Sequence, residues 1–175
     1  FAMAYVGLAD SYNLLAGQHA YLSPKEAFPK AQAASHKALE ITNGTLAEAY
    51  TSLAFTTYYY ERNRPLAKQY FERAIKLKPH YPTSYHWHGE ALASEGRFEE
   101  AIEKLKKAQE LDPLSPAITT DLAQVFLLAG RIDECRYLLN QLLEINPNFI
   151  NALYFFALLC EKSGDFPIAV EVLNQ

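Results

Sequence analysis

Two histidines separated by one residue are the first side chains in this sequence that could carry chemistry. His86 and His88 flank Trp87 in the segment YHWHGE. Residues i and i+2 of a helix point to nearly opposite sides, whereas zinc-binding helices carry their histidines at i and i+4. The two imidazoles therefore cannot bind one ion between them, and we expect no metal site.

The rest of the sequence contains no pattern that predicts catalysis. Its seven glycines mostly mark turns and form no loop that could hold a phosphate group. Carboxylates are plentiful, but they lie where helices should start or face water, and no nucleophile can be matched with a neighbouring base. We therefore predict that the protein is not an enzyme and uses no cofactor.

The elements that position these side chains follow a repeat of 34 residues. Residues 85–113 have the pattern of two amphipathic helices joined by a glycine turn and closed by a proline. A turn glycine, a closing proline and two small residues each recur at this interval. They are Gly96, Gly130 and Gly164; Pro79, Pro113 and Pro147; Gly89, Ala123 and Ala157; and Ala101, Cys135 and Ala169. Self-similarity at this period predicts stacked helical hairpins.

This pattern resembles the tetratricopeptide repeat, in which W-x2-L-G-x2-Y is followed by A-x3-F and P at the same period. In residues 82–115 its places are held by Tyr85, His88, Gly89, Leu92, Ala101, Leu105 and Pro113. His88 departs from the pattern, which has leucine there. The resemblance implies an all-α fold, a right-handed superhelical solenoid of antiparallel helix hairpins with about four complete units and a truncated fifth.

The repeats divide the chain into five segments within one predicted solenoid domain, residues 1–175. They are residues 2–46, 47–81, 82–115, 116–149 and 150–175. In the first segment, ten extra residues separate the helices, and Ser23, Pro24 and Glu26 predict a capping-box start for the second helix. In the second, Asn63 replaces the turn glycine and is expected to adopt a positive φ.

Both ends of the sequence lie inside helical patterns, so we expect it to be part of a longer protein. Terminal repeats of such arrays need a polar cap. None follows the apolar residues Phe155, Phe156, Leu158 and Leu159. We therefore expect further repeats or a capping helix to follow in the parent protein, and we predict that the exposed C-terminal end of this fragment can self-associate in isolation.

Composition limits the class of partner. The chain carries 16 Lys and Arg against 20 Asp and Glu, a net charge of −4, which gives no electrostatic reason to expect nucleic acid or a membrane surface. No apolar run approaches the roughly 20 residues that span a bilayer, and no signal peptide is visible. Because the sequence is expected to be part of a longer protein, these absences leave the compartment open, with the cytoplasm favoured. Cys135 and Cys160 are expected to be buried, inert thiols.

The resemblance also suggests a binding surface. In tetratricopeptide repeat proteins the first helix of each repeat lines a concave groove, and the matching positions here are Thr51, Phe55, Tyr58, Tyr59, His86, Glu90, Thr120, Gln124 and Tyr154. Asp10 and Asn13 would extend this row. The family members that clamp a C-terminal carboxylate use Lys and Asn at inner positions, which are absent here. An aromatic row instead predicts binding of an extended peptide or a helix. Packing of these side chains between repeats is the alternative, and it applies equally to Trp87.

These observations favour a non-catalytic scaffold for protein–protein interaction. Residues 1–12, 23–41 and 85–102 resemble the repeat tails of bacterial multidomain regulators, which suggests a regulatory or sensory part of a larger bacterial protein. Two other functions remain open. The repeats could be purely architectural or serve oligomerisation. They could also bind RNA, as pentatricopeptide repeats do, although RNA readers need a basic groove that this sequence lacks.

Overall fold

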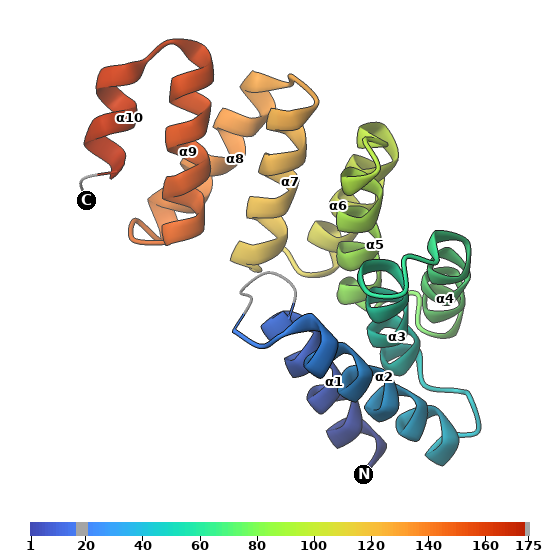
Figure 1. The fold of residues 1–175 in the computed structure, drawn as a ribbon. Coiled ribbons are helices and arrows are strands. Elements are labelled where there is room, and N and C mark those ends of the chain that lie inside the picture. The colour runs from blue at the N-terminus through green and yellow to red at the C-terminus, as the bar shows by residue number, and fades with distance from the viewer. Residues whose placement is uncertain (17–20, 174–175) are drawn as a thin grey trace. The chain divides into compact units, whose positions relative to one another are not determined.

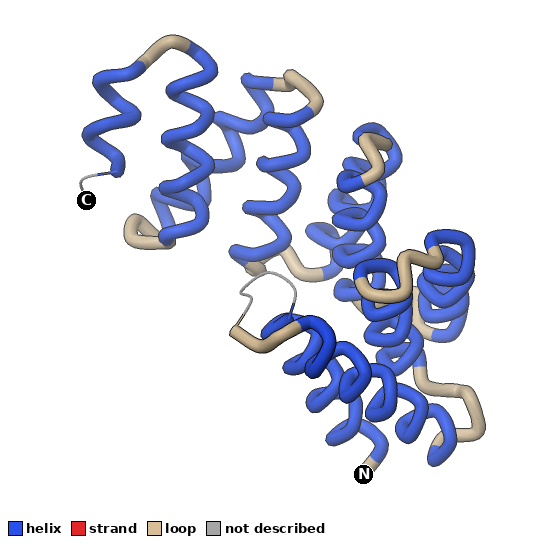
Figure 2. Tube along the Cα trace, in the orientation of Figure 1, coloured by secondary structure: helices blue, strands red, loops and turns tan. Residues whose placement is uncertain are grey.

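The computed structural model describes residues 1–16 and 21–173, with side chains up to residue 171. Helices joined by short loops account for these residues, and no strand occurs among them (Figure 1, Figure 2). The helices are α1 (Ala2–Ala16), α2 (Pro24–Ile41), α3 (Ala47–Tyr59), α4 (Arg64–Leu77), α5 (Pro82–Ser94), α6 (Phe98–Leu111), α7 (Pro116–Leu128), α8 (Ile132–Ile145), α9 (Ile150–Ser163) and α10 (Phe166–Leu173).

The helices form consecutive pairs, and each expected repeat segment contains one pair. Helices α3, α5, α7 and α9 begin at Ala47, Pro82, Pro116 and Ile150, the first residues of the last four segments. The pairs α1–α2, α3–α4, α7–α8 and α9–α10 pack as hairpins (Figure 1). In the remaining pair, Leu92 of α5 belongs to the same core as α6. The expected all-α array of helix hairpins is confirmed.

Three turns repeat the same backbone geometry at the predicted spacing. Gly96, Gly130 and Gly164 have φ of 76°, 75° and 82°. At each turn, the amide after the glycine donates to a carbonyl five residues earlier, as in the 3.1 Å bond from Arg97 N to Leu92 O. The glycine amide donates to a carbonyl three residues earlier. This pair of bonds is the Schellman motif, which requires a left-handed residue after the helix.

The first hairpin has a longer second helix than the others, as its sequence predicts. Helix α2 begins at Pro24, with Ser23 as its N-cap residue. The expected capping box is wrong, because the Ser23 side chain makes no cap hydrogen bond. The Glu26 carboxylate instead accepts a 2.8 Å hydrogen bond from Lys30 Nζ, its neighbour one turn along the helix. Part of the expected insertion, residues 17–20, lies outside the described residues.

The turn between α3 and α4 corrects a second local prediction. Arg62 adopts the positive φ, at 59°. Asn63 has φ of −92° and is the N-cap residue of α4, where its side-chain oxygen accepts a 3.2 Å hydrogen bond from Leu66 N. The carboxamide thereby satisfies an amide of the first turn that has no partner within the helix. Asn63 therefore caps the start of α4, and Arg62 takes the left-handed conformation in this turn.

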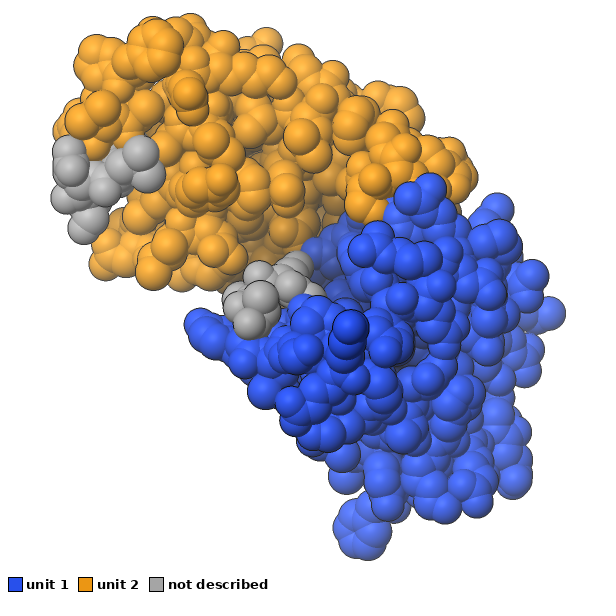
Figure 3. Space-filling view, viewed as in Figure 1, with its two compact units in different colours: residues 1–91 blue, residues 92–175 orange. Residues whose placement is uncertain are grey.

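The chain divides into two compact units, residues 1–91 and 92–175 (Figure 3). In unit 1, α1 and α2 pack against α3, and an aromatic-rich core surrounds Phe71 and Trp87. In unit 2, α6 packs against α7, α7 and α8 pack against α9, and the core is rich in leucine. The recurring small residues are buried, which allows helices to pack closely at these positions.

Candidate functional site

Four aromatic side chains of α3 and α5 form the largest ring cluster in unit 1. Phe55 lies 4.5 Å from Tyr59 and 4.9 Å from Trp87 between ring centroids, and Tyr58 meets Tyr59 edge-on at 4.8 Å. Phe55, Tyr58 and Trp87 are buried, whereas Tyr59 is partly exposed. We call these four residues the aromatic platform. Its buried rings hold the partly exposed ring of Tyr59 in a fixed position.

Two hydrogen bonds join α3 and α5 on either side of these rings. The hydroxyls of Thr51 and Ser84 are 2.7 Å apart, and the Tyr58 hydroxyl donates to Ala91 O at 3.0 Å. Both bonds are buried. Thr51, Phe55 and Tyr58 therefore pack between two repeats, the alternative that the sequence left open for these residues.

The other residues of the predicted row differ in exposure. Thr120 is buried, and its hydroxyl donates to Pro116 O at 2.8 Å. His86, Glu90 and Gln124 are partly exposed. Tyr154 is the most exposed member, at 53%. Within unit 1, Tyr59, His86 and Glu90 are thus the predicted residues whose side chains reach the surface.

The two histidines of the YHWHGE segment have different environments. His88 is buried and stacks on Phe71 of α4, with ring centroids 4.9 Å apart and planes within 7°. His86, two residues earlier, is partly exposed on α5. His88 therefore fills the leucine place of the repeat as a flat core side chain.

Asp10 and Asn13 of α1 are held by hydrogen bonds to α3. Asn13 is fully buried; its Nδ2 donates to Ser52 O at 3.0 Å, and its Oδ1 accepts from Thr56 Oγ1 at 2.8 Å. The Ser52 hydroxyl donates to Asp10. These two residues, expected to extend a binding row, instead join two hairpins. Sequence spacing gave no sign of this network, because serine and threonine on α3 have no fixed partner in the pattern.

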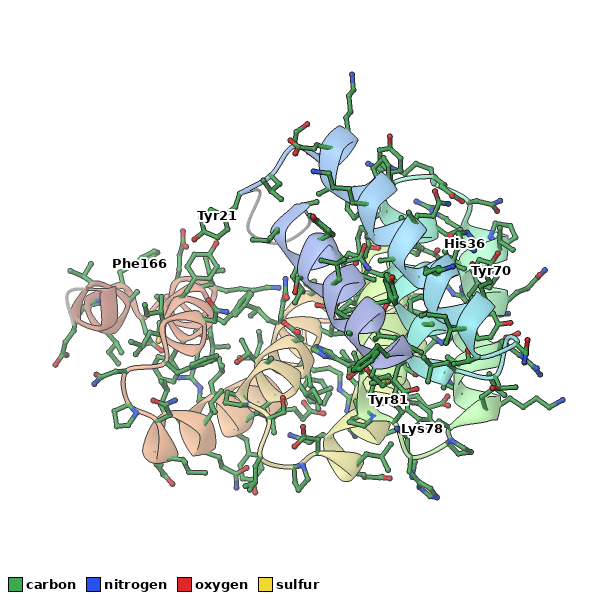
Figure 4. All side chains as sticks on the ribbon, turned by 90° about the horizontal axis from the view of Figure 1, so that it is seen from below. Tyr21, His36, Tyr70, Lys78, Tyr81 and Phe166 are labelled. Carbon is green, nitrogen blue, oxygen red and sulfur yellow. The ribbon has the colours of Figure 1, made fainter. Side chains whose placement is uncertain are left out.

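Burial changes the ionisation of Asp10. It raises the pKa of this carboxyl from 3.8 to about 6, opposed by the hydrogen bond from Ser52 and aided by the negative charge of Glu48. Glu48 is itself buried and pairs with Lys78 at 2.5 Å. Figure 4 shows Lys78 beside Tyr81, and Lys78 Nζ lies 5.3 Å from the centre of that ring. Burial also raises the pKa of Tyr81.

The two cysteines are buried and form no disulfide. Burial raises the pKa of Cys135 to about 11, and it also raises the pKa of Cys160. A raised pKa leaves little of the reactive thiolate at neutral pH. The prediction that both thiols are buried is confirmed, and their raised pKa values support the prediction that they are unreactive.

An apolar pocket of about 230 Å³ lies between α9 and α10 in unit 2. Its lining combines small residues at the helix contact with larger apolar side chains around it. The lining residues are Tyr154, Ala157, Leu158, Glu161, Phe166, Ala169 and Val170. Phe166, labelled in Figure 4, is 60% exposed, and Val170 is 59% exposed. The pocket is therefore an open apolar surface.

Comparison with protein families agrees with this architecture. Two family models, both described as tetratricopeptide repeat, match residues 53–116 and 92–159. The chain is a tetratricopeptide repeat protein. As such it has the fold of a protein–protein interaction scaffold, a class that is generally non-catalytic. Among the described helices of this TPR chain, none is both long and apolar enough to cross a bilayer.

One curated relative of this TPR protein is bacterial. The TPR repeat-containing protein YpiA of Bacillus subtilis is 24% identical over 100 residues, which is 57% of this chain. The match covers 24% of YpiA, so the TPR chain spans about a quarter of that relative.

Three solved structures share the fold. A structure of PilF from Pseudomonas aeruginosa has a TM-score of 0.73 and 22% identity, over 98% of this chain and 76% of that one. MamA has a TM-score of 0.69 and 23% identity, over 86% of each chain. YrrB, described as a TPR protein with an unusual peptide-binding site, has a TM-score of 0.64 and 22% identity, over 99% of this chain and 84% of that one.

Proposed function

We propose that this TPR protein binds an extended peptide or a helix of a partner protein at the aromatic platform. The partial exposure of Tyr59 above buried Phe55 and Tyr58 is the observation that supports this most. A tyrosine held by packed rings loses little side-chain freedom on binding, and such aromatic anchors supply much of the affinity at protein interfaces.

Polar side chains beside the platform suit a polypeptide ligand. His86 and Glu90 lie one turn apart on α5, the helix that also carries Trp87, and both are partly exposed. The imidazole of His86 can hydrogen-bond the main-chain or side-chain groups of a peptide, whereas Oε2 of the Glu90 carboxylate is buried. The negative charge at Glu90 favours a neutral or basic ligand over an acidic one.

The comparisons give further support to a peptide ligand. YrrB shares the fold and is described by its peptide-binding site. The match to part of a bacterial TPR protein agrees with the proposed role as a regulatory or sensory segment of a larger bacterial protein, and a cytoplasmic location belongs to the same proposal.

Selection of peptides followed by titration tests this proposal. Peptides chosen from a random library against the chain would be titrated while the fluorescence of Trp87, the single tryptophan, is recorded. Tyr59→Ala should weaken binding by about tenfold to a hundredfold, the range expected for loss of an interfacial aromatic anchor. Retained helicity by circular dichroism would show that the variant is folded.

Tyr137→Ala is the matched control, because Tyr137 is a 61% exposed tyrosine on α8 in the other unit. Its removal should leave peptide affinity unchanged. A library that yields no binder, or binders that tolerate Tyr59→Ala as well as Tyr137→Ala, would refute the platform as the binding site.

A further inference from the structure

The second helices of the first four hairpins differ in charge. Helix α4 carries four lysine or arginine residues and one acidic residue, which are Arg64, Lys68, Arg73 and Lys76 against Glu72. Helix α2 has three such basic residues against two acidic ones, α6 has three against four, and α8 has one against three. Helix α4 is therefore the most basic of the four, in a chain whose net charge is −4.

The basic side chains of α4 lie outside its buried face. The buried residues of the helix are Ala67, Phe71 and Ala74. Four basic residues of the helix and the turn before it are exposed, and we call them the basic face: Arg62, Lys68, Arg73 and Lys76. Helix α4 belongs to the second hairpin, which has a hairpin before it and others after it in the chain. The basic face is thus not a stacking face at an end of the array.

Most of the basic face has no carboxylate partner within the described chain. Lys68 pairs with Glu72 at 3.7 Å. Among residues 1–16 and 21–171, no carboxylate forms an ion pair with Arg62, Arg73 or Lys76. On α2, by contrast, two of the three lysines form ion pairs with glutamates of the same helix, at 2.8 and 2.9 Å. The charges of α4 are therefore not balanced in the way that a solvated helix usually balances them.

The stability of α4 does not explain its charge. Arg62 precedes the helix, whose first turn contains no acidic residue, whereas the first turns of α2, α6 and α8 all contain one or two. A cation at this end of a helix opposes the helix dipole. Arg73 and Lys76 lie one turn apart, where like charges repel. Only Lys76 lies in the last turn, where the dipole favours a cation.

We propose that the basic face of α4 binds an acidic segment of a partner protein. Arginine and lysine side chains pair with carboxylates, and the guanidinium of Arg73 can hold one through two parallel hydrogen bonds. Gln69 lies one turn before Arg73 on the exposed side of α4, so its amide can bond the main chain of the same segment.

The charge pattern favours an acidic polypeptide over nucleic acid. From Arg62 to Lys76 the face extends about 20 Å along the helix. Glu61 and Glu72 are exposed within this length, so the positive charge is interrupted. Spaced carboxylates of a peptide can match such a pattern, whereas the continuous phosphates of a nucleic acid need an unbroken basic groove. The face shares no residue with the aromatic platform, so the two proposals are tested separately.

Fluorescence anisotropy with a fluorescein-labelled octaglutamate peptide tests the proposal. In about 50 mM NaCl the chain should bind this probe with a Kd below about 1 mM, and in about 500 mM NaCl the binding should be lost through screening. The triple variant Arg62→Gln, Arg73→Gln, Lys76→Gln should bind about tenfold more weakly, because each exposed pair contributes modestly. Glutamine suits a helix nearly as well as lysine or arginine, so circular dichroism should show unchanged helicity.

A second triple variant is the matched control. Lys25→Gln, Lys106→Gln, Lys107→Gln removes the same three positive charges from exposed positions of α2 and α6. It should bind octaglutamate as the wild type does. A single-stranded oligonucleotide of about 20 thymidines, measured in the same buffer, should bind more weakly than the peptide.

Each of three results would overturn the proposal. The first is a wild-type chain that does not bind octaglutamate at low salt. The second is an equal loss of affinity in the two triple variants, which would mean that net charge and not the basic face attracts the probe. The third is tighter binding of the oligonucleotide with a loss confined to the α4 variant, which would assign the face to nucleic acid.

Discussion

At the scale of single residues, the most informative feature is a polar row between α1 and α3. Asn13 is fully buried with both ends of its carboxamide satisfied, and Asp10 accepts from Ser52. A buried amide with both groups bonded costs little, whereas the carboxylate of Asp10 loses hydration that one hydroxyl does not replace. The raised pKa of Asp10 records this loss.

The pH dependence of stability should reveal the cost of ionising Asp10. Its pKa is about 6 in the folded chain, against an ordinary value of 3.8. Between these two pKa values the folded state binds more protons than the unfolded state. The contribution of Asp10 to the unfolding free energy is therefore fully present below about pH 4 and is lost as the pH rises through about 6. Asp10→Asn, which stays neutral, should therefore be more stable than the wild type by about 1–3 kcal/mol above pH 7.

Urea unfolding followed by circular dichroism across the pH range would measure this difference. The advantage of Asp10→Asn should vanish below about pH 4, where the wild-type carboxyl is also neutral. Glu144→Gln, at an exposed position of α8, should show no comparable gain. A variant less stable than the wild type at neutral pH would mean that the charged carboxylate is needed at this place.

At the scale of elements, the turns set the hairpin geometry through backbone conformation. Gly96 has φ of 76°, and nothing lies within 4 Å of the Cβ that a larger residue would carry. Space is therefore not the constraint there. The constraint is the left-handed conformation itself, which costs an L-residue with a side chain roughly 1 kcal/mol.

Two glycine substitutions should have opposite effects on stability. Gly96→Ala should lower the unfolding free energy by about 1 kcal/mol, because alanine is strained at this φ. Gly7→Ala, in the interior of α1 with open space around its Cβ, should raise it by about 0.5–1 kcal/mol. Urea unfolding at low protein concentration would measure both, and a loss of stability in both variants would contradict the conformational explanation.

At the scale of the whole molecule, the two compact units have cores of different composition. Unit 1 is built on aromatic rings with buried hydroxyl and amide groups, and unit 2 is built mainly on leucine. Repeat proteins contact only their nearest neighbours, so their stability is a sum of local terms rather than one global value. Damage to one core should therefore remain local.

Leu139→Ala tests this locality, because Leu139 is fully buried in the core of unit 2. The substitution should destabilise that core by about 2–5 kcal/mol through the cavity it leaves. Hydrogen exchange measured by mass spectrometry should show faster exchange in α7, α8 and α9, with little change in α1 to α3. Equal acceleration in both units would instead indicate one cooperative structure.

The pairing of helices into hairpins was predictable from the sequence. The spacing of Gly96, Gly130 and Gly164 predicted three glycine turns, and all three occur, each with a positive φ. Such features are local, because helix periodicity and turn conformation depend on residues a few positions apart. Two local predictions were wrong: the capping bond of Ser23 and the positive φ of Asn63. Both concern a polar residue at a helix start, whose side chain can either cap the helix or leave that role unused.

The exposure of side chains in the predicted row depends on tertiary packing and could not be read from the sequence. Thr51, Phe55 and Tyr58 matched groove positions, yet they are buried against α5, whereas Tyr59 remains partly exposed. Whether a side chain of α3 is buried depends on the residues of α5 that it contacts. Thr51, for example, is buried against Ser84, which lies 33 residues later in the sequence. A repeat pattern gives each side chain its direction, but burial depends on the neighbouring helix that it meets there.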